Sequence, residues 1–116
     1  MKKPGQVILF RFPQTDLNEG KLRPAILLKE VPGEHKDWLI CMISSQQHQF
    51  NAEFDEIIRK EDADFVLSGL KSVSVVRALR LAVVDDDILI GSIGEISQNR
   101  LSRITSRLGK WISDGN

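Results

Sequence analysis

An arginine at the start of a predicted strand is the residue with the clearest chemical potential. Arg23 precedes Pro24, which has no N–H and biases the residue before it toward extended geometry, and the apolar run 25–31 follows. A guanidinium presents its donors in a planar fork that matches phosphate or carboxylate oxygens. Arg23 is therefore interpreted either as a clamp for such a group or as a strand-edge arginine that pairs with Glu19 or with solvent.

Two further polar residues are expected near Arg23. Ser44 closes the apolar run 38–43, and the short turn at Pro32 and Gly33 favours an antiparallel return between this run and 25–31. The start of one strand and the end of the other then lie at the same end of the sheet. Arg77 follows two valines on a later predicted strand and is expected to join the pair from the sheet face.

Short strands must position these residues. Runs rich in β-branched and aromatic residues, bounded by turn residues, predict extended segments at 6–12, 25–31, 38–43, 55–58, 72–81 and 88–93. Loops are predicted at 44–51 and 67–71, and a turn at 85–87. This order predicts a mainly β fold with a C-terminal helix, a small curved antiparallel sheet or half-open barrel on which the helix packs.

Residues 97–113 are the predicted helix, with Ser97 as its N-cap. Its apolar face comprises Leu101, Ile104, Leu108 and Ile112. A neighbouring basic stripe comprises Arg100, Arg103, Arg107 and Lys110. We interpret the basic stripe either as a surface for RNA or an acidic partner, or as a solvated flank whose aliphatic stems cover apolar surface.

Composition limits the class of protein. The 116 residues, of which 41% are hydrophobic, predict one domain over 1–116. The formal net charge of zero argues against a constitutive duplex-DNA binder. The lone Cys41, inside an apolar run, is expected to be a core residue of a protein in a reducing compartment. No apolar run approaches the ~20 residues that span a bilayer, and no signal peptide is evident, so a soluble cytoplasmic protein is expected.

Several familiar sites are absent from the sequence. It contains no glycine-rich phosphate loop, no paired metal-binding histidines, no cysteine pair and no nucleophile elbow, so neither a metal nor a cofactor is expected. The acidic triplet 85–87 is interpreted as a solvated turn, since consecutive carboxylates point in different directions. His48 lies four residues after Ser44 and is interpreted as a surface histidine, with a Ser–His pair as the alternative.

Short motifs follow one another in a defined order along nearly the whole chain. They lie at 5–7, 11–13, 15–16, 21–25, 41–46, 68–71, 74–77 and 93–97. Each motif is weak alone, but the ordered set resembles the MazF/PemK family of toxins.

The resemblance implies a sequence-preferring endoribonuclease, the toxin of a type II toxin–antitoxin pair, with the curved, SH3-like half-open barrel of the MazF/PemK/CcdB type. Such enzymes cut single-stranded RNA without metal and leave a 2′,3′-cyclic phosphate and a 5′-hydroxyl, which inhibits translation and growth. The implied partners are the RNA, a cognate antitoxin and a second copy of the chain. Membranes are not implied, and DNA is implied only through the toxin–antitoxin complex.

By position, the resemblance makes Arg23 the catalytic arginine and Arg77 an arginine that many PemK-like members keep. Ser44 stands where the family usually has threonine. Two residues depart from the pattern: Gln6 replaces a frequent acid, and Leu79 lies where some members have an acid assigned to proton transfer. The residues expected to bind substrate are Thr15, Glu19, Lys21, Ser45, Gln46, His48 and Phe50.

Some assignments stay open at this point. The general base is either Glu19 or His48, and Phe50 is the candidate for stacking an RNA base. The antitoxin is expected to be an acidic, partly disordered chain that folds onto a groove lined by Arg23 and the basic stripe. Two alternative functions remain, a gyrase-directed toxin that cuts nothing and a non-catalytic module that binds protein or nucleic acid.

Overall fold

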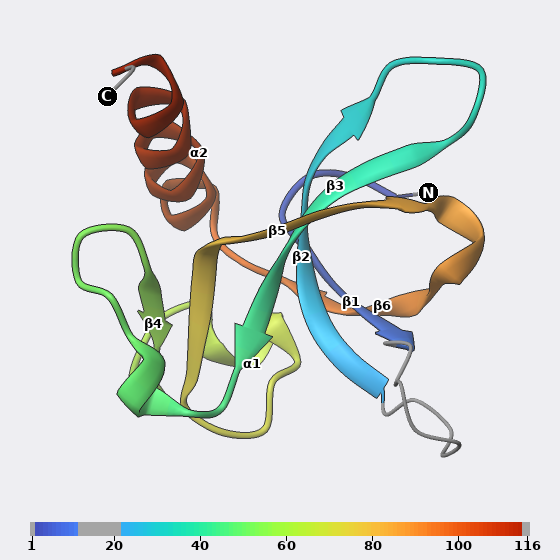
Figure 1. Ribbon diagram of the computed structural model, residues 1–116. Helices are drawn as coiled ribbons and strands as arrows, with labels where there is room; N and C mark the ends of the chain where they lie inside the picture. The colour runs from blue at the N-terminus through green and yellow to red at the C-terminus, as the bar shows by residue number, and fades with distance from the viewer. Residues whose placement is uncertain (1, 12–21, 115–116) are drawn as a thin grey trace.

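The computed structural model describes residues 2–11 and 22–114, and within them one six-stranded antiparallel sheet dominates (Figure 1). The strand order is β4-β5-β3-β2-β1-β6. The strands are β1 (Gln6–Arg11), β2 (Leu22–Val31), β3 (Asp37–Ser44), β4 (Glu56–Ile58), β5 (Ser74–Asp85) and β6 (Leu89–Glu95). The helices are α1 (Phe65–Ser68) and α2 (Gln98–Ser113), with 3₁₀ turns η1 (Gln47–Gln49) and η2 (Asp86–Ile88). The curved antiparallel sheet with a C-terminal helix confirms the predicted fold class.

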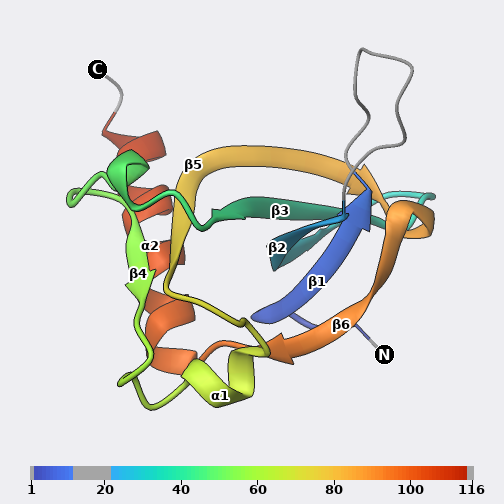
Figure 2. The ribbon, with the colours of Figure 1, turned by 90° about the horizontal axis from the view of Figure 1, so that it is seen from below.

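A break in register curves the sheet sharply at β5. Met42 of β3 pairs with Arg77, whereas its neighbour Cys41 pairs with Leu81, so residues 78–80 of β5 have no partner on β3. Extra residues on one strand bend it and increase its twist. Figure 2 shows the result: β5 turns a corner, and the strands from β5 through β3, β2 and β1 to β6 wrap into a partial barrel.

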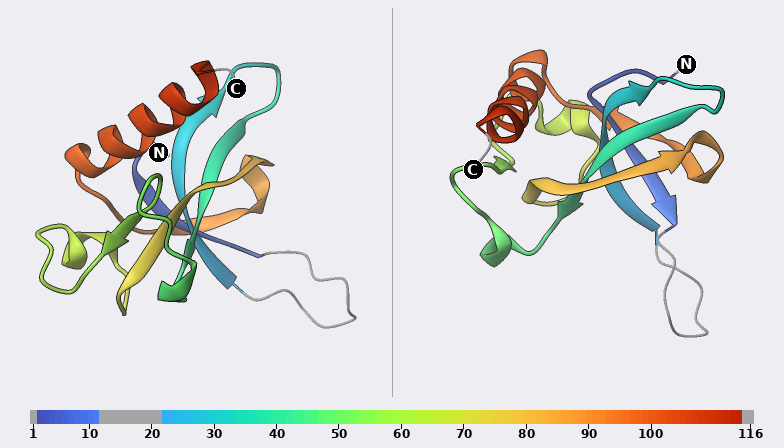
Figure 3. Two further views of the ribbon diagram at one scale, coloured as in Figure 1. Left: turned by 60° about the vertical axis from the view of Figure 1, so that its left-hand side comes forward. Right: turned by 45° about the horizontal axis from the view of Figure 1, so that its top comes forward.

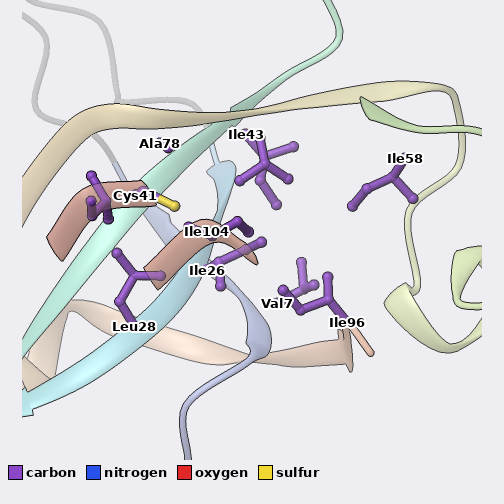
Figure 4. Packing of buried hydrophobic residues seen from close by; sticks show 11 residues of the cluster. Val7, Ile26, Leu28, Cys41, Ile43, Ile58, Ala78, Ile96 and Ile104 are labelled. Atoms are coloured by element: carbon purple, nitrogen blue, oxygen red, sulfur yellow. The ribbon is translucent and has the colours of Figure 1, made fainter. Parts of the chain in front are cut away.

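Apolar side chains fill both faces of the sheet, as the near-continuous apolar runs of β2 and β3 predict. The first cluster lies between the sheet and α2 (Figure 4). Its buried members are Val7, Ile26, Leu28, Cys41, Ile43, Ile58, Val76, Ala78, Ile96, Ile104 and Leu108. The second cluster lies on the opposite face, inside the partial barrel, and comprises Ile8, Phe10, Ala25, Leu27, Trp38, Ile40 and Leu89.

The helix α2 lies on one side of the sheet (Figure 3). Ser97 caps it as predicted, because its Oγ accepts a hydrogen bond from the N–H of Arg100 at 3.2 Å. Ile104 and Leu108 are buried in the first cluster. The prediction for Ile112 is wrong: its side chain is 67% exposed, because the last turn of α2 extends beyond that cluster.

The predicted loop at 67–71 begins in fact with the end of the one-turn helix α1. Gly69 closes α1 with a φ of 73°, in the left-handed region that glycine tolerates. A Cβ at Gly69 would overlap the carbonyl of Ile93, and a Cβ at Gly94 would overlap the carbonyl of Leu67. The two glycines therefore let α1 pack directly on the backbone of β6. No helix in the described ranges is long and apolar enough to cross a membrane.

Candidate functional site

Strand register brings the three predicted catalytic residues to one end of the sheet. Ala25 of β2 pairs with Met42 of β3, and extending this register by two residues places Arg23 opposite Ser44. On the other side of β3, Met42 pairs with Arg77. Arg23, Ser44 and Arg77 thus lie on three adjacent strands, within two residues of one another along the sheet.

The same three side chains share one face. Side chains alternate along a strand, so Arg23 lies on the face of Ala25, and both Ser44 and Arg77 lie on the face of Met42. Ala25 and Met42 belong to the second cluster, inside the partial barrel. Arg23, Ser44 and Arg77 therefore lie next to the second apolar cluster, on the same face of the sheet, where β2 begins and β3 ends.

Local contacts orient two members of the group. The Oγ of Ser44 accepts a hydrogen bond from the N–H of Gln46 at 3.0 Å, which leaves the hydroxyl its own proton to donate. The Nη1 of Arg77 donates to the Oε1 of Gln49 in η1 at 3.4 Å. Ser44 and Arg77 are half-buried and Arg23 is exposed.

The charge of this end of the sheet is not neutralised by the described part of the chain. Within residues 2–11 and 22–114, no carboxylate forms an ion pair with Arg23 or Arg77. Two guanidiniums without an ion pair in the described ranges, together with a hydroxyl on the same face, are donors that suit an anion with several oxygens, such as a phosphodiester.

The remaining predicted substrate-binding residues fall into two groups. Thr15, Glu19 and Lys21 lie outside the described residues. Ser45, Gln46 and His48 are exposed and Phe50 is half-buried, all in the segment that leaves β3 through η1. This segment borders Arg77 through the hydrogen bond between Gln49 and the Arg77 guanidinium.

The prediction of a solvent-facing basic stripe is wrong for Arg100, which is buried, whereas Arg103 and Lys110 are exposed. Three of the four basic residues form ion pairs with acids of the chain. Arg100 is 5% exposed, and its Nε and Nη2 donate to the two carboxylate oxygens of Asp64 at 2.8 and 2.9 Å. Arg100, Arg103 and Arg107 all contact Glu56, at 3.2, 2.8 and 2.7 Å. We call Glu56, Asp62 and Asp64 with these three arginines the ion network.

The ion network lowers the pKa values of Asp64 and Glu56. The hydrogen bonds from Arg100 lower the pKa of Asp64 to about 2. Burial alone raises the pKa of Glu56, but the hydrogen bonds and charges of Arg103 and Arg107 outweigh it, and the pKa lies below its usual value. Glu56 and Asp64 stay ionised, and α2 is bound electrostatically to β4 and to the loop after it.

Two residues outside the predicted site also have informative surroundings. Burial raises the pKa of the Cys41 thiol to about 12, which confirms a core residue and argues against a nucleophile. Leu79, which stands in place of a family acid, is half-buried and packs against the first cluster.

Two residues that support Arg77 are not among the predicted site residues. The sequence places Gln49 in the predicted loop 44–51 and Asp55 at the start of the predicted extended segment 55–58. Asp55 is in fact 6% exposed, and its Oδ1 accepts a hydrogen bond from the N–H of Ala78 at 3.0 Å. No local signal separates it from the neighbouring surface acids, because its partner lies 23 residues away in the chain.

Comparisons with known proteins agree with this geometry. A family model described as PemK-like, MazF-like toxin of type II toxin–antitoxin system matches residues 3–112. A solved structure, an endoribonuclease in complex with its cognate antitoxin from mycobacterial species, has a similar fold with a TM-score of 0.65. The match covers 97% of this chain and 96% of that chain at 14% identity. Curated proteins gave no match. The family match spans nearly the whole chain, so this chain belongs to the PemK-like, MazF-like toxins of type II toxin–antitoxin systems.

Proposed function

We propose that this toxin is an endoribonuclease that cuts single-stranded RNA without a metal ion. The observation that carries the proposal is the convergence of Arg23, Ser44 and Arg77 on one face at one end of the sheet. Family membership and a similar fold in an endoribonuclease that binds an antitoxin support it.

The proposed reaction is transfer of a phosphodiester to the neighbouring 2′-hydroxyl. The 2′-oxygen attacks phosphorus, a base removes its proton, the bond to the 5′-oxygen breaks, and that oxygen takes up a proton. The products are a 2′,3′-cyclic phosphate and a 5′-hydroxyl. Negative charge grows on the phosphoryl oxygens in the transition state, and pre-positioned donors that match this charge lower the barrier.

The three residues take different parts in this proposal. A guanidinium with a pKa above ~12 is a poor base, so Arg23 is assigned to stabilising the developing charge. Arg23 also donates a proton toward the leaving oxygen. Ser44 donates its hydroxyl proton to a phosphoryl oxygen, and Arg77 adds a second positive charge. The base stays open between Glu19, outside the described residues, and the exposed His48 of η1.

Two partners complete the proposal. An acidic antitoxin segment is proposed to cover the face of Arg23 and Arg77, two arginines that form no ion pair within residues 2–11 and 22–114. The three arginines of the basic stripe are left out of this proposed surface, because they already pair with acids of the ion network. A homodimer is also proposed, and sedimentation that shows only monomer at micromolar concentration would contradict it.

The decisive test is cleavage of a single-stranded RNA transcript by pure protein in the presence of a chelator. We expect products with cyclic phosphate and 5′-hydroxyl ends. An oligonucleotide with one 2′-deoxy substitution at the mapped scissile position should resist cleavage, while the same substitution at a distant position should not matter. Cleavage of the deoxy position, or a requirement for a divalent ion, would refute the mechanism. Absence of any cleavage would favour a non-catalytic toxin.

A further inference from the structure

A buried carboxylate bridges the two segments that surround Arg77. The Oδ1 of Asp55 accepts a hydrogen bond from the N–H of Ala78, the residue directly after Arg77 in β5. Its Oδ2 accepts from the N–H of Asn51 at 2.9 Å. Asn51 lies two residues after Gln49, whose side chain bonds the Arg77 guanidinium. One carboxylate therefore ties the backbone of Arg77 to the segment that holds its side chain.

The Asp55 carboxylate bonds to β5 at the point where β5 loses its pairing with β3. Residues 78–80 have no partner on β3, because the register of β5 shifts between Arg77 and Leu81. A buried backbone N–H without a partner is costly, and the N–H of Ala78 is satisfied by Asp55 instead of by a neighbouring strand. Asp55 thereby holds the backbone of β5 at its bend, directly after Arg77.

The other contacts of Asp55 hold the bridge in place. Its own N–H donates to the carbonyl of Asn51 at 2.8 Å, and its carbonyl accepts from Arg107 Nη1 at 3.2 Å. The residue is thus fixed from both its backbone and its side chain. Such an arrangement restricts a loop next to a reactive group more tightly than packing alone.

We propose that Asp55, together with Gln49, positions Arg77 for its part in RNA cleavage. Asp55 touches neither substrate nor the reacting atoms in this proposal and acts only through Arg77. The inference rests on the proposed function, because Asp55 and Gln49 would support a residue of that same site.

A double-mutant cycle tests the coupling. Asp55→Asn keeps the size of the side chain but turns one acceptor into a donor, so one of its two backbone bonds is lost. A misplacement of about 1 Å in a catalytic group costs on the order of 100-fold in rate. We therefore expect kcat to fall by about that factor with KM little changed. In an Arg77→Ala background, Asp55→Asn should lower kcat by less than about 3-fold, since Arg77 is no longer there to misplace.

Two further variants separate positioning from general stability. Asp64→Asn is the matched control, since Asp64 is also a buried carboxylate that accepts a backbone N–H, from Ser97 at 3.0 Å. It should weaken the fold and leave the kcat of folded protein unchanged. Gln49→Ala removes the hydrogen bond to the Arg77 guanidinium. Gln49 is half-buried, so this variant can replace Asp55→Asn in the test if Asp55→Asn does not fold. It should lower kcat about 10-fold in the wild-type background only.

Equal loss of kcat from Asp55→Asn with and without Arg77 would overturn the inference, as would the same loss from Asp64→Asn. Amide hydrogen exchange gives a readout that needs no activity. Exchange at the amide that loses its bond, Ala78 or Asn51, should accelerate more in Asp55→Asn than in Asp64→Asn, and unchanged exchange at both amides would refute the bridge. If the wild type cuts no RNA, the proposed function fails and the catalytic part of this inference fails with it, whereas exchange still decides the bridge.

Discussion

Arginines lie on both sides of the sheet, and their surroundings differ completely. On the side of α2, Arg100, Arg103 and Arg107 donate to carboxylates, and Arg100 is buried. On the other side, Arg23 and Arg77 lie at a strand end without an ion pair in the described part of the chain. Arginines that pair with carboxylates hold α2 in place, whereas arginines without such a pair can bind an anionic ligand.

The difference teaches how to separate structural from functional arginines in one chain. Both groups are close in sequence to apolar runs, and both have basic or polar neighbours. What distinguishes them is the presence of Glu56, Asp62 and Asp64 opposite α2. We therefore expect substitutions in the ion network to lower stability and substitutions at the strand end to lower activity.

The largest effect is expected from Arg100→Met. Removing one partner of a buried ion pair leaves the others uncompensated, which typically costs about 3–5 kcal/mol of unfolding free energy. Urea unfolding measures the loss. Arg103→Met is the control from the same network: its side chain is 47% exposed, so we expect a loss below about 1 kcal/mol. Equal losses would show that burial does not distinguish the two arginines.

The reverse pattern is expected from Arg23→Ala. Loss of a charged donor to the transition state should reduce cleavage by about 100- to 1,000-fold, which corresponds to about 3–4 kcal/mol in the barrier. The unfolding free energy should change by less than about 0.5 kcal/mol, because the side chain is exposed. Lys29→Ala, an exposed cation at the other end of β2, is the control and should keep full activity. A comparable drop in stability would place Arg23 with the structural arginines.

The ion network should also make stability depend on pH. Arg100 lowers the pKa of Asp64 to about 2 in the folded protein, below its usual value of about 4 when unfolded. The contribution of Asp64 is therefore complete above about pH 4 and is lost as the pH falls toward 2. Urea midpoints measured across this range should fall more steeply in the wild type than in Asp64→Asn. Parallel curves would contradict the role of Asp64.

The smallest effect is expected from Ser44→Ala. One neutral donor is lost where Arg23→Ala loses a charged fork, so the cost should be about 1 kcal/mol, roughly fivefold in the cleavage rate. Ser44→Thr keeps the hydroxyl and should retain most of the activity. A Ser44→Ala variant with unchanged kcat would remove the hydroxyl from the mechanism and leave the two arginines as its core.

Local patterns were sufficient for most of the fold. The apolar runs and the turn at Pro32 and Gly33 predicted the antiparallel pairing of β2 with β3, and the structure confirms it. The same pairing explains why Arg23 and Ser44 were expected together, since antiparallel neighbours joined by a short turn bring one start and one end side by side. The N-cap of α2 was equally visible, because its hydrogen bond joins residues only three apart.

Contacts between distant segments were not visible in the sequence. The charge spacing on α2 indicated a basic stripe but not the acids that face it, and Asp64 lies 36 residues before Arg100. The burial of Asp55 could not be predicted either, because the local sequence does not distinguish a buried aspartate from a solvated one. The bend of β5 also depends on pairing with β3 rather than on any residue of its own.

The sequence by itself determined the order of strands and helix, the cap of α2 and the family resemblance, because these depend on residues near one another or on motifs in order. Only the tertiary structure decided which arginines form ion pairs within the described ranges and which do not. The reason is physical: the fate of a charge depends on the carboxylates and the solvent that surround it, and folding brings those from segments far apart in the chain.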